Sequence, residues 1–310
     1  MNRPSDPYLV EATRLGGLYV AGRLEEAVAL TERLAVEFPE RAVSSAYARA
    51  CVLAMLGRPA EALDGLKGAV AGGGWLTPRQ LDDPDLDPLA ELDGYADLVA
   101  TMRARSDSAL EAARATTARQ AVVRPDATPT AVVVALHMAG VEGAETEAIW
   151  APVAGSGLAV VVPESTLRNG DGRPCWDDPG VALRDVTAAV TLARGLGAGA
   201  PVVLAGGSQG AGVATRLALS GAAGEVAGFL AVVGAPGPDE YDVPRDRVVR
   251  GVLLAGGDDP LSAARQRAVH AELADAGHDV ELVEVPGLAH VYPDDWGRVG
   301  SDLVERLIAH

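Results

Sequence analysis

Residues 201–219 read PVVLAGGSQGAGVATRLAL, and this stretch decides the fold. Its first five residues form an uninterrupted apolar run, which is typical of a strand buried on both faces. After a glycine-rich turn, apolar residues recur with helical spacing, at Val213, Ala214, Leu217 and Ala218. The stretch therefore predicts a strand, a sharp turn and a helix, with Ser208 at the turn.

The turn itself, Gly206–Gly210, matches the pattern G-x-S-x-G. A serine exposed on such a turn is the nucleophile elbow of serine-dependent enzymes. Glycines are needed there because the backbone is strained and a side chain would collide with the neighbouring strand or helix. The alternative is a glycine-rich turn with an incidental serine.

Similar apolar runs follow one another on both sides of this stretch. Strands are expected at 131–136, 158–162, 201–205, 227–234, 249–255 and 279–285, with helical segments between them. Runs without polar alternation indicate strands covered on both faces. We therefore predict an α/β fold with a mostly parallel sheet, right-handed crossovers and helices on both sides.

A serine hydroxyl is a weak nucleophile at neutral pH, so it needs a base and a third group that orients the base. Asp259 follows the strand expected at 249–255, and His290 follows the strand expected at 279–285. Both lie just past the carboxyl end of a strand, where open α/β sheets bind their ligands.

The acid has other candidates. Because Asp259 precedes Pro260, it is also a suitable helix N-cap, and both roles stay open. Asp258 is the second choice. A less favoured source is the acidic loop after the preceding strand, with Asp239, Glu240 and Asp242.

For the base, the alternative is that His290 is an exposed loop histidine without a catalytic role. The remaining histidines fit the base position less well: His137, His270, His278 and His310.

Four segments taken together suggest a family: PES at 163–165, GGSQG at 206–210, GGDD at 256–259 and PGLAHVYP at 286–293. With them, residues 130–310 resemble compact serine α/β-hydrolases of the phospholipase/carboxylesterase and dienelactone-hydrolase-like group. The order Ser, Asp, His is also that of α/β-hydrolases. The resemblance implies Ser208, Asp259 and His290 as catalysts, a small-molecule ester or thioester substrate, and no metal or organic cofactor.

Acyl transfer also requires N–H donors for the developing oxyanion. The first is the N–H of Gln209, directly after the nucleophile. The second is expected in His137-Met138-Ala139-Gly140, which stands where the family has its HG-x-G loop. Met138 replaces the usual glycine, so the donor is either Ala139 or Met138. His137 is expected only to orient this loop.

Several large apolar residues are expected on loops near the strand ends: Trp176, Trp150, Met138, Pro236 and Tyr292. They are candidates for the wall of an apolar substrate pocket, and ordinary packing is the alternative for each of them.

The first hundred residues follow a different pattern. AGRLEEA at 21–27 is echoed by LGRPAEA at 56–62, an offset of 35 residues that is typical of repeated helical pairs. Gly22, Ala27 and Pro39, and again Gly57, Ala62 and Ala69, stand at the spacing of a tetratricopeptide repeat, which this part resembles. The second unit lacks the closing proline. The alternative is a simple helical cap on the next domain.

A further helix is expected at 106–120, and RPDATPT at 124–130 then ends any helix. We therefore predict an all-α domain at 1–120 and the α/β-hydrolase domain at 121–310. Two repeats are too few for independent stability. The small domain is expected either to pack on the α/β domain and narrow the mouth of the active site, or to bind a protein partner or a second copy in a homodimer.

The balance of acidic and basic residues limits the kinds of partner that the protein is expected to bind. The chain has 43 acidic and 26 basic residues and a net charge of −17, which repels nucleic acid and anionic membranes. Its apolar runs are too short to cross a bilayer. Only two cysteines occur, without a CxxC motif, and no secretion signal is recognisable. We therefore expect a cytoplasmic protein that binds neither nucleic acid nor membranes.

These observations predict a serine hydrolase that acts on a carboxylic ester or thioester. The same three residues also suit acyl transfer, cyclisation or elimination in a biosynthetic pathway, since the access of water depends on the pocket. A third hypothesis is a scaffold protein with a non-catalytic hydrolase-like domain, which the intact Ser, Asp and His disfavour.

Overall fold

The computed structural model describes residues 7–125, 127–155, 157–197 and 199–309. The chain forms two compact units. An α/β unit contains Thr117–Thr166 and Pro174–His310, and a helical unit contains Asp6–Thr116 and Leu167–Arg173. The short segment Leu167–Arg173 thus belongs to the helical unit, although both of its neighbours in the chain belong to the α/β unit.

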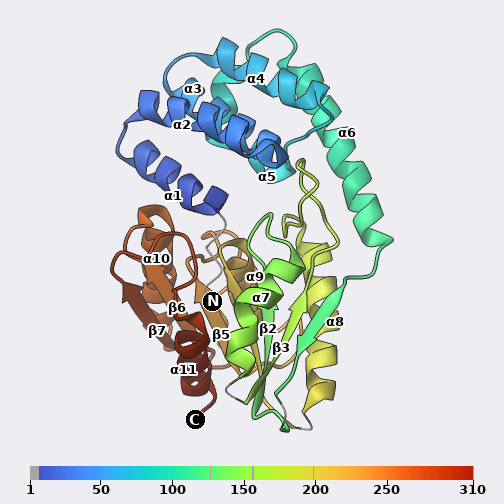
Figure 1. Cartoon of the computed structure of the whole chain (residues 1–310), viewed down its shortest axis with the longest axis vertical. Helices are drawn as coiled ribbons and strands as arrows, with labels where there is room; N and C mark the ends of the chain where they lie inside the picture. Colours follow the sequence, from blue (N-terminus) through green and yellow to red (C-terminus); the bar gives the residue numbers. More distant parts are fainter. Residues whose placement is uncertain (1–6, 126, 156, 198, 310) are drawn as a thin grey trace. The chain divides into compact units, whose positions relative to one another are not determined.

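A sheet with the strand order β1-β3-β2-β4-β5-β6-β7 forms the centre of the α/β unit (Figure 1). Its strands are β1 (Gln120–Val123), β2 (Ala131–Leu136), β3 (Leu158–Pro163), β4 (Val202–Gly207), β5 (Gly228–Val232), β6 (Arg250–Gly256) and β7 (Asp279–Val285). β1 is antiparallel to β3, and all other pairs are parallel. The predicted α/β fold with a mostly parallel sheet is confirmed.

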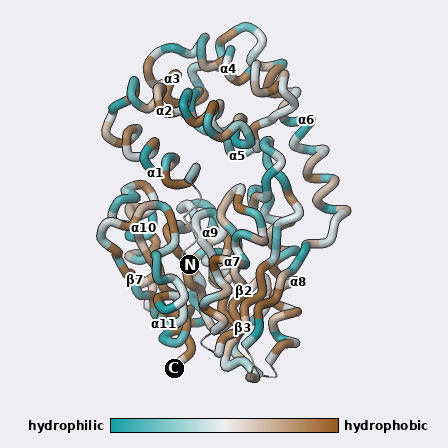
Figure 2. Tube along the Cα trace, viewed as in Figure 1, coloured by the Kyte–Doolittle hydropathy of each residue, from teal (hydrophilic) through white to brown (hydrophobic). Residues whose placement is uncertain are grey.

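Helices cover both faces of this sheet. They are α7 (Gly143–Ala154), α8 (Pro179–Leu196), α9 (Gln209–Ser220), α10 (Pro260–Asp275) and α11 (Trp296–Ile308). α8, α9 and α10 share one apolar cluster with alternate strand residues. α7 and α11 pack on each other, where Ser301 donates a hydrogen bond to the carbonyl of Val153. Every residue of β2, β3 and β4 is buried, and Figure 2 shows β2 and β3 as hydrophobic stretches. Burial of the central strands therefore stabilises this unit.

The start of the α/β unit differs from the prediction. The helix expected at 106–120 is wrong in its bounds, because α6 spans Tyr95–Arg114. β-branched Thr116 and Thr117 follow, and such residues favour extended backbone. The chain then forms β1, which was not predicted because its four residues are only half-buried. Pairing with β3 satisfies the backbone groups on the facing edges of the two strands.

The helical unit is all-α, as expected. It contains α1 (Pro7–Val20), α2 (Leu24–Glu37), η1 (Pro39–Arg41), α3 (Ala42–Met55), α4 (Pro59–Ala71), α5 (Pro78–Leu81), η2 (Pro84–Leu89) and α6. It has a core of its own, in which Leu34, Leu53, Leu66, Leu89 and Met102 are at most 1% exposed.

The two helical pairs repeat the same turn. Gly22 ends α1 with a φ of 68°, and Gly57 ends α3 with a φ of 72°. The N–H of Arg23 donates to the carbonyl of Leu18, and the N–H of Arg58 donates to that of Leu53, each at 2.9 Å. These bonds, 35 residues apart, are the 6→1 bonds of a helix-ending motif that requires a left-handed residue. The sequence repeat is therefore also a structural repeat.

Gly57→Ala is expected to destabilise the helical unit by about 1 kcal/mol, because a Cβ is unfavourable at a left-handed φ. Gly68→Ala is the matched control. Gly68 is exposed in the interior of α4 and has open space around it, so alanine should stabilise by about 0.5–1 kcal/mol. Urea unfolding followed by circular dichroism should show midpoints that move in opposite directions. Equal shifts would contradict this account of the turn.

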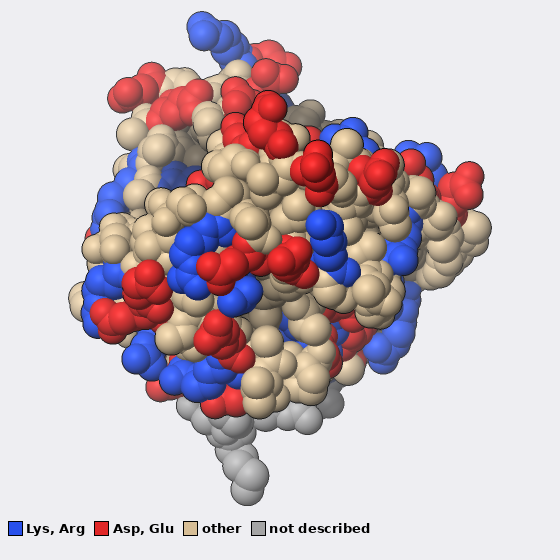
Figure 3. All heavy atoms as spheres, turned by 90° about the horizontal axis from the view of Figure 1, so that it is seen from above, with Lys and Arg blue, Asp and Glu red and all other residues tan. Residues whose placement is uncertain are grey.

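Within the described residues, none of the helices combines the length and the apolar character that crossing a bilayer requires. On the face of the molecule shown in Figure 3, acidic and basic side chains lie interspersed. Ion pairs in the described part of the chain include the bidentate contact of Arg58 with Glu61.

Candidate active site

Ser208 lies between β4 and α9 in a strained turn. Its φ of 51° and ψ of −119° are unusual for a residue with a side chain. A Cβ on Gly206 would lie 2.6 Å from the carbonyl carbon of Gly210, and one on Gly210 would lie 2.6 Å from the carbonyl oxygen of His137. Glycine is thus required on both sides of the turn because backbone segments approach closely there.

A continuous chain of hydrogen bonds starts at this serine. The Ser208 hydroxyl donates to Nε2 of His290 at 2.6 Å, and Nδ1 of His290 donates to Oδ2 of Asp259 at 2.5 Å. The side chain of Asp259 is 9% exposed and that of His290 is 24% exposed. A buried carboxylate beside a ring N–H holds the imidazole in the tautomer whose Nε2 can accept a proton.

Each carboxylate oxygen of Asp259 accepts a different hydrogen bond. Oδ2 accepts the bond from His290, while Oδ1 accepts the N–H of Ser262 at 3.4 Å and so caps α10. The other acids lie elsewhere: Asp258, Asp239, Glu240 and Asp242 are all exposed, and the Glu240 carboxylate accepts the N–H of Gly237.

The loop after β2 is fixed by His137, which is fully buried. Its Nε2 accepts the N–H of Ser165 at 3.1 Å, so Nδ1 carries the proton and donates to the carbonyl of Met138 at 2.8 Å. Because C=O and N–H point in opposite directions in a trans peptide, the N–H of Ala139 points away from the imidazole. Trp176 stacks on this ring at 4.5 Å.

Gln209 is the first residue of α9, so its N–H has no acceptor within the helix. Its side chain is held from both ends. Oε1 accepts the N–H of Trp176 at 2.8 Å, and Nε2 donates to Oδ1 of Asp177 at 2.7 Å. Asp177 was not singled out in the sequence. Only its position one residue after Trp176 could have suggested it.

The residues predicted to line a pocket are mostly buried. Trp150 was expected on a loop, and this prediction is wrong. It lies inside α7, where it is 0% exposed and packs against Trp296. Trp176 and Met138 are each 4% exposed, and Pro236 is buried. Tyr292 is half-buried and accepts a bond from Trp150 Nε1 at 3.3 Å.

Tyr292 approaches the turn that holds Ser208. A Cβ on Gly207 would lie 2.7 Å from the Tyr292 hydroxyl and 2.6 Å from Cε of Met138. Burial raises the pKa of the Tyr292 phenol, so it remains protonated at neutral pH.

His270 and His278 form hydrogen bonds with backbone groups and not with Ser208. His278 is buried and accepts the N–H of Val249 at 3.2 Å, and His270 bonds the carbonyl of Val280 at 3.1 Å. His310 lies outside the described residues.

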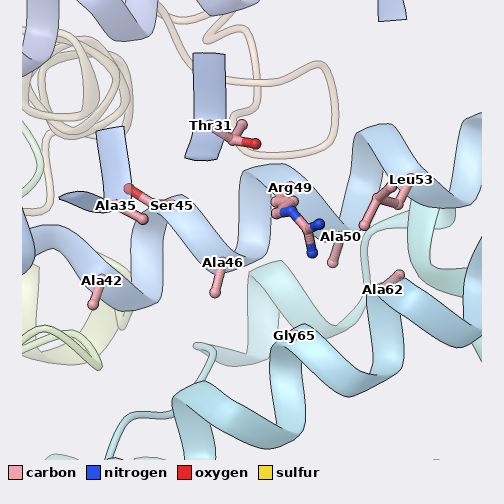
Figure 4. Close-up of a pocket in the computed structure, with 10 residues that line it drawn as sticks. All are labelled: Thr31, Ala35, Ala42, Ser45, Ala46, Arg49, Ala50, Leu53, Ala62 and Gly65. Carbon is pink, nitrogen blue, oxygen red and sulfur yellow. The ribbon is translucent and has the colours of Figure 1, made fainter. Parts of the chain in front are cut away.

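A pocket of about 110 Å³ lies elsewhere, between α2, α3 and α4 of the helical unit (Figure 4). Small side chains line most of it, and Arg49 contributes its guanidinium. It contains neither Ser208 nor either of its hydrogen-bonded partners.

One group of residues in the described chain comes close enough to hold a metal ion, namely Cys51, Asp83 and Asp85 of the helical unit. Tyr47 donates to Asp83, and Tyr19 donates to Asp85 at 2.5 Å. Burial, and then the two carboxylates, raise the pKa of the Cys51 thiol to about 12.

No family model matches the chain. No curated protein matches it either. Among solved structures, an uncharacterized protein from Bacillus cereus ATCC 10987 aligns with 96% of this chain and 98% of its own, at 20% identity and a TM-score of 0.52. The Bacillus cereus carboxylesterase aligns with 64% of this chain and 99% of its own, at 15% identity and a TM-score of 0.52. These likenesses show the fold: the chain contains an α/β-hydrolase fold.

Proposed function

We propose that this protein is a serine hydrolase that cleaves a carboxylic ester or thioester through an acyl-enzyme on Ser208. The observation that carries the proposal is the chain of hydrogen bonds from Ser208 through His290 to Asp259. The strained turn supports it, because the cost of a left-handed serine is compensated where the hydroxyl has a chemical role.

In the first half-reaction, Oγ of Ser208 attacks the substrate carbonyl while Nε2 of His290 takes the hydroxyl proton. Asp259 stabilises the imidazolium and keeps its orientation. When the tetrahedral intermediate collapses, the bond to the alkoxide or thiolate breaks, and His290 returns the proton to this leaving group. Water then attacks the acyl-enzyme with His290 again as base, and the carboxylic acid leaves.

The developing oxyanion needs donors that are already in place. We assign them to the N–H groups of Gln209 and Ala139. The first lies at the start of α9, where the helix dipole also favours negative charge. The second is favoured over Met138 because the bond from His137 to the Met138 carbonyl orients the peptide that carries it. The half-buried Tyr292 is our candidate for the pocket wall.

The helical pairs, in the same proposal, are tetratricopeptide-like repeats, as the repeated glycine turns support. We also propose a cytoplasmic location, since two cysteines in 310 residues offer no disulfide framework.

A fluorophosphonate probe tests the proposed chemistry directly. It should label the intact protein, and peptide mapping should find the adduct on Ser208 alone, because the hydroxyl of Ser208 donates to the imidazole of His290, which can take its proton. An adduct on another serine, or no adduct at all, would overturn the assignment. Heat-unfolded protein is the control for reactivity that does not depend on the fold.

A further inference from the structure

The segment Leu167–Arg173 connects the two units through the chain itself. It lies between β3 and α8, yet its contacts place it in the helical unit. The chain leaves the α/β unit after Thr166 and returns at Pro174. Arg173, the last residue of this segment, is bonded directly to Pro174, where the α/β unit resumes.

Asp171 anchors the segment to the start of α3. Its carboxylate accepts the N–H of Val43 at 2.7 Å, the N–H of Ser44 at 3.0 Å and the hydroxyl of Ser44 at 2.5 Å. First-turn N–H groups have no partner within a helix, and the N-cap residue Arg41 supplies no side-chain acceptor. Asp171 thus caps α3 from 128 positions away, and the helix dipole adds to the attraction.

The segment is held as a closed loop. Oδ1 of Asn169 accepts the N–H groups of Asp171 at 3.1 Å and Arg173 at 3.0 Å, and the N–H of Asn169 donates to the carbonyl of Arg173 at 2.8 Å. Gly170 lies so close to the backbone of Trp75 that a Cβ would overlap its carbonyl oxygen. Because these hydrogen bonds hold the loop closed, a displacement of Asp171 is expected to displace Arg173 as well.

The returning residues bind next to one proposed oxyanion donor, at Gly140, and to the side chain of the other, Gln209. The carbonyl of Pro174 accepts the N–H of Gly140 at 2.7 Å, in the loop that follows β2. The N–H of Trp176 donates to the side chain of Gln209, which also donates to Asp177. Three residues after Asp171, the chain thus begins a run that supports the loop after β2 and the first residue of α9.

We propose that Asp171 is a positioning residue for the oxyanion donors, an inference that rests on the proposed hydrolase function. Its carboxylate holds the segment in the helical unit, the segment sets residues 174–177, and these set the N–H groups of Ala139 and Gln209. The donors act on charge that develops in the transition state, so their displacement lowers kcat and leaves KM nearly unchanged.

The test compares Asp171→Ala with Ser44→Ala and Asp83→Ala. Asp171→Ala is expected to lower kcat for a p-nitrophenyl ester about tenfold to a hundredfold, the scale of a misplaced catalytic group, with KM within about twofold. Ser44→Ala removes one of the three bonds and should give a smaller loss of the same kind. Asp83→Ala removes the cap of η2 and the partner of Tyr47, so it perturbs the helical unit without touching the segment.

Hydrogen exchange supplies a readout that does not depend on activity. In Asp171→Ala the amides of Gly140 and Trp176 should exchange faster, while in Asp83→Ala they should not change. If Asp171→Ala matches Asp83→Ala in both kcat and exchange, the inference is overturned. If the wild type shows no ester turnover but Asp171→Ala still accelerates exchange at these two amides, the proposed function has failed and the structural coupling stands.

Discussion

Ser208→Ala is expected to lower kcat/KM for an ester substrate by a factor on the order of 10⁶, because it removes the atom that attacks the carbonyl. The remaining activity would come from the oxyanion donors and from binding alone. Steady-state hydrolysis of p-nitrophenyl esters measures the loss, and loss of fluorophosphonate labelling should accompany it.

Ser220→Ala is the matched control, since Ser220 lies at the far end of α9 and is exposed. It should retain full turnover. A Ser208→Ala variant that keeps more than about a hundredth of the activity, while its circular dichroism and unfolding midpoint equal those of the wild type, would refute the role of Ser208 as nucleophile.

Asp259→Asn is expected to lower kcat by a factor of about 10⁴. The amide can present its NH₂ to Nδ1 of His290, which favours the tautomer with the proton on Nε2, and that tautomer cannot accept the proton of Ser208. Asparagine is also a good N-cap, so α10 should keep its stability. Kinetics and thermal unfolding measured together separate the catalytic role of this residue from its structural role.

Asp258→Asn serves as the comparison because Asp258 is adjacent in sequence and exposed. It should change kcat less than about threefold, as expected for a surface charge. A larger loss from Asp258→Asn than from Asp259→Asn would move the acid by one residue. If neither substitution matters, the acid belongs to the loop around Asp239.

The parts of the fold that follow from the sequence are those in which burial dominates. The strand predicted at 131–136 has the bounds of β2, in which every residue is buried. The strand predicted at 279–285 also has the bounds of β7, although this outer strand has no buried residue. β1 was missed because its four half-buried residues form a strand only through pairing with β3. The position of Leu167–Arg173 could not be predicted either, since a contact between Asp171 and α3 decides it.

The candidate site divides in the same way. Motifs and spacing singled out Ser208, Asp259 and His290, and the structure brings their side chains into contact. The aromatic residues were harder to place, because an apolar residue suits a pocket wall and a core equally well. Trp150 became a core residue since α7 turns it toward Trp296. The contacts of Gln209 with Trp176 and Asp177 join distant segments, so no local sequence pattern predicts them.

The two outer strands of the sheet also bear on how copies of the chain meet one another. An outer strand offers unpaired N–H and C=O groups to which a strand of another molecule can add. β7 carries exposed Asp279, Glu281 and Glu284, paired with arginines at 3.5, 2.7 and 2.6 Å, and charged side chains oppose such addition. At the opposite edge of the sheet, the short β1 pairs with β3 and so occupies the edge of β3. A fragment that begins after Val123 would expose the edge of β3 and invite aggregation, so any truncation that removes the helical unit should retain β1.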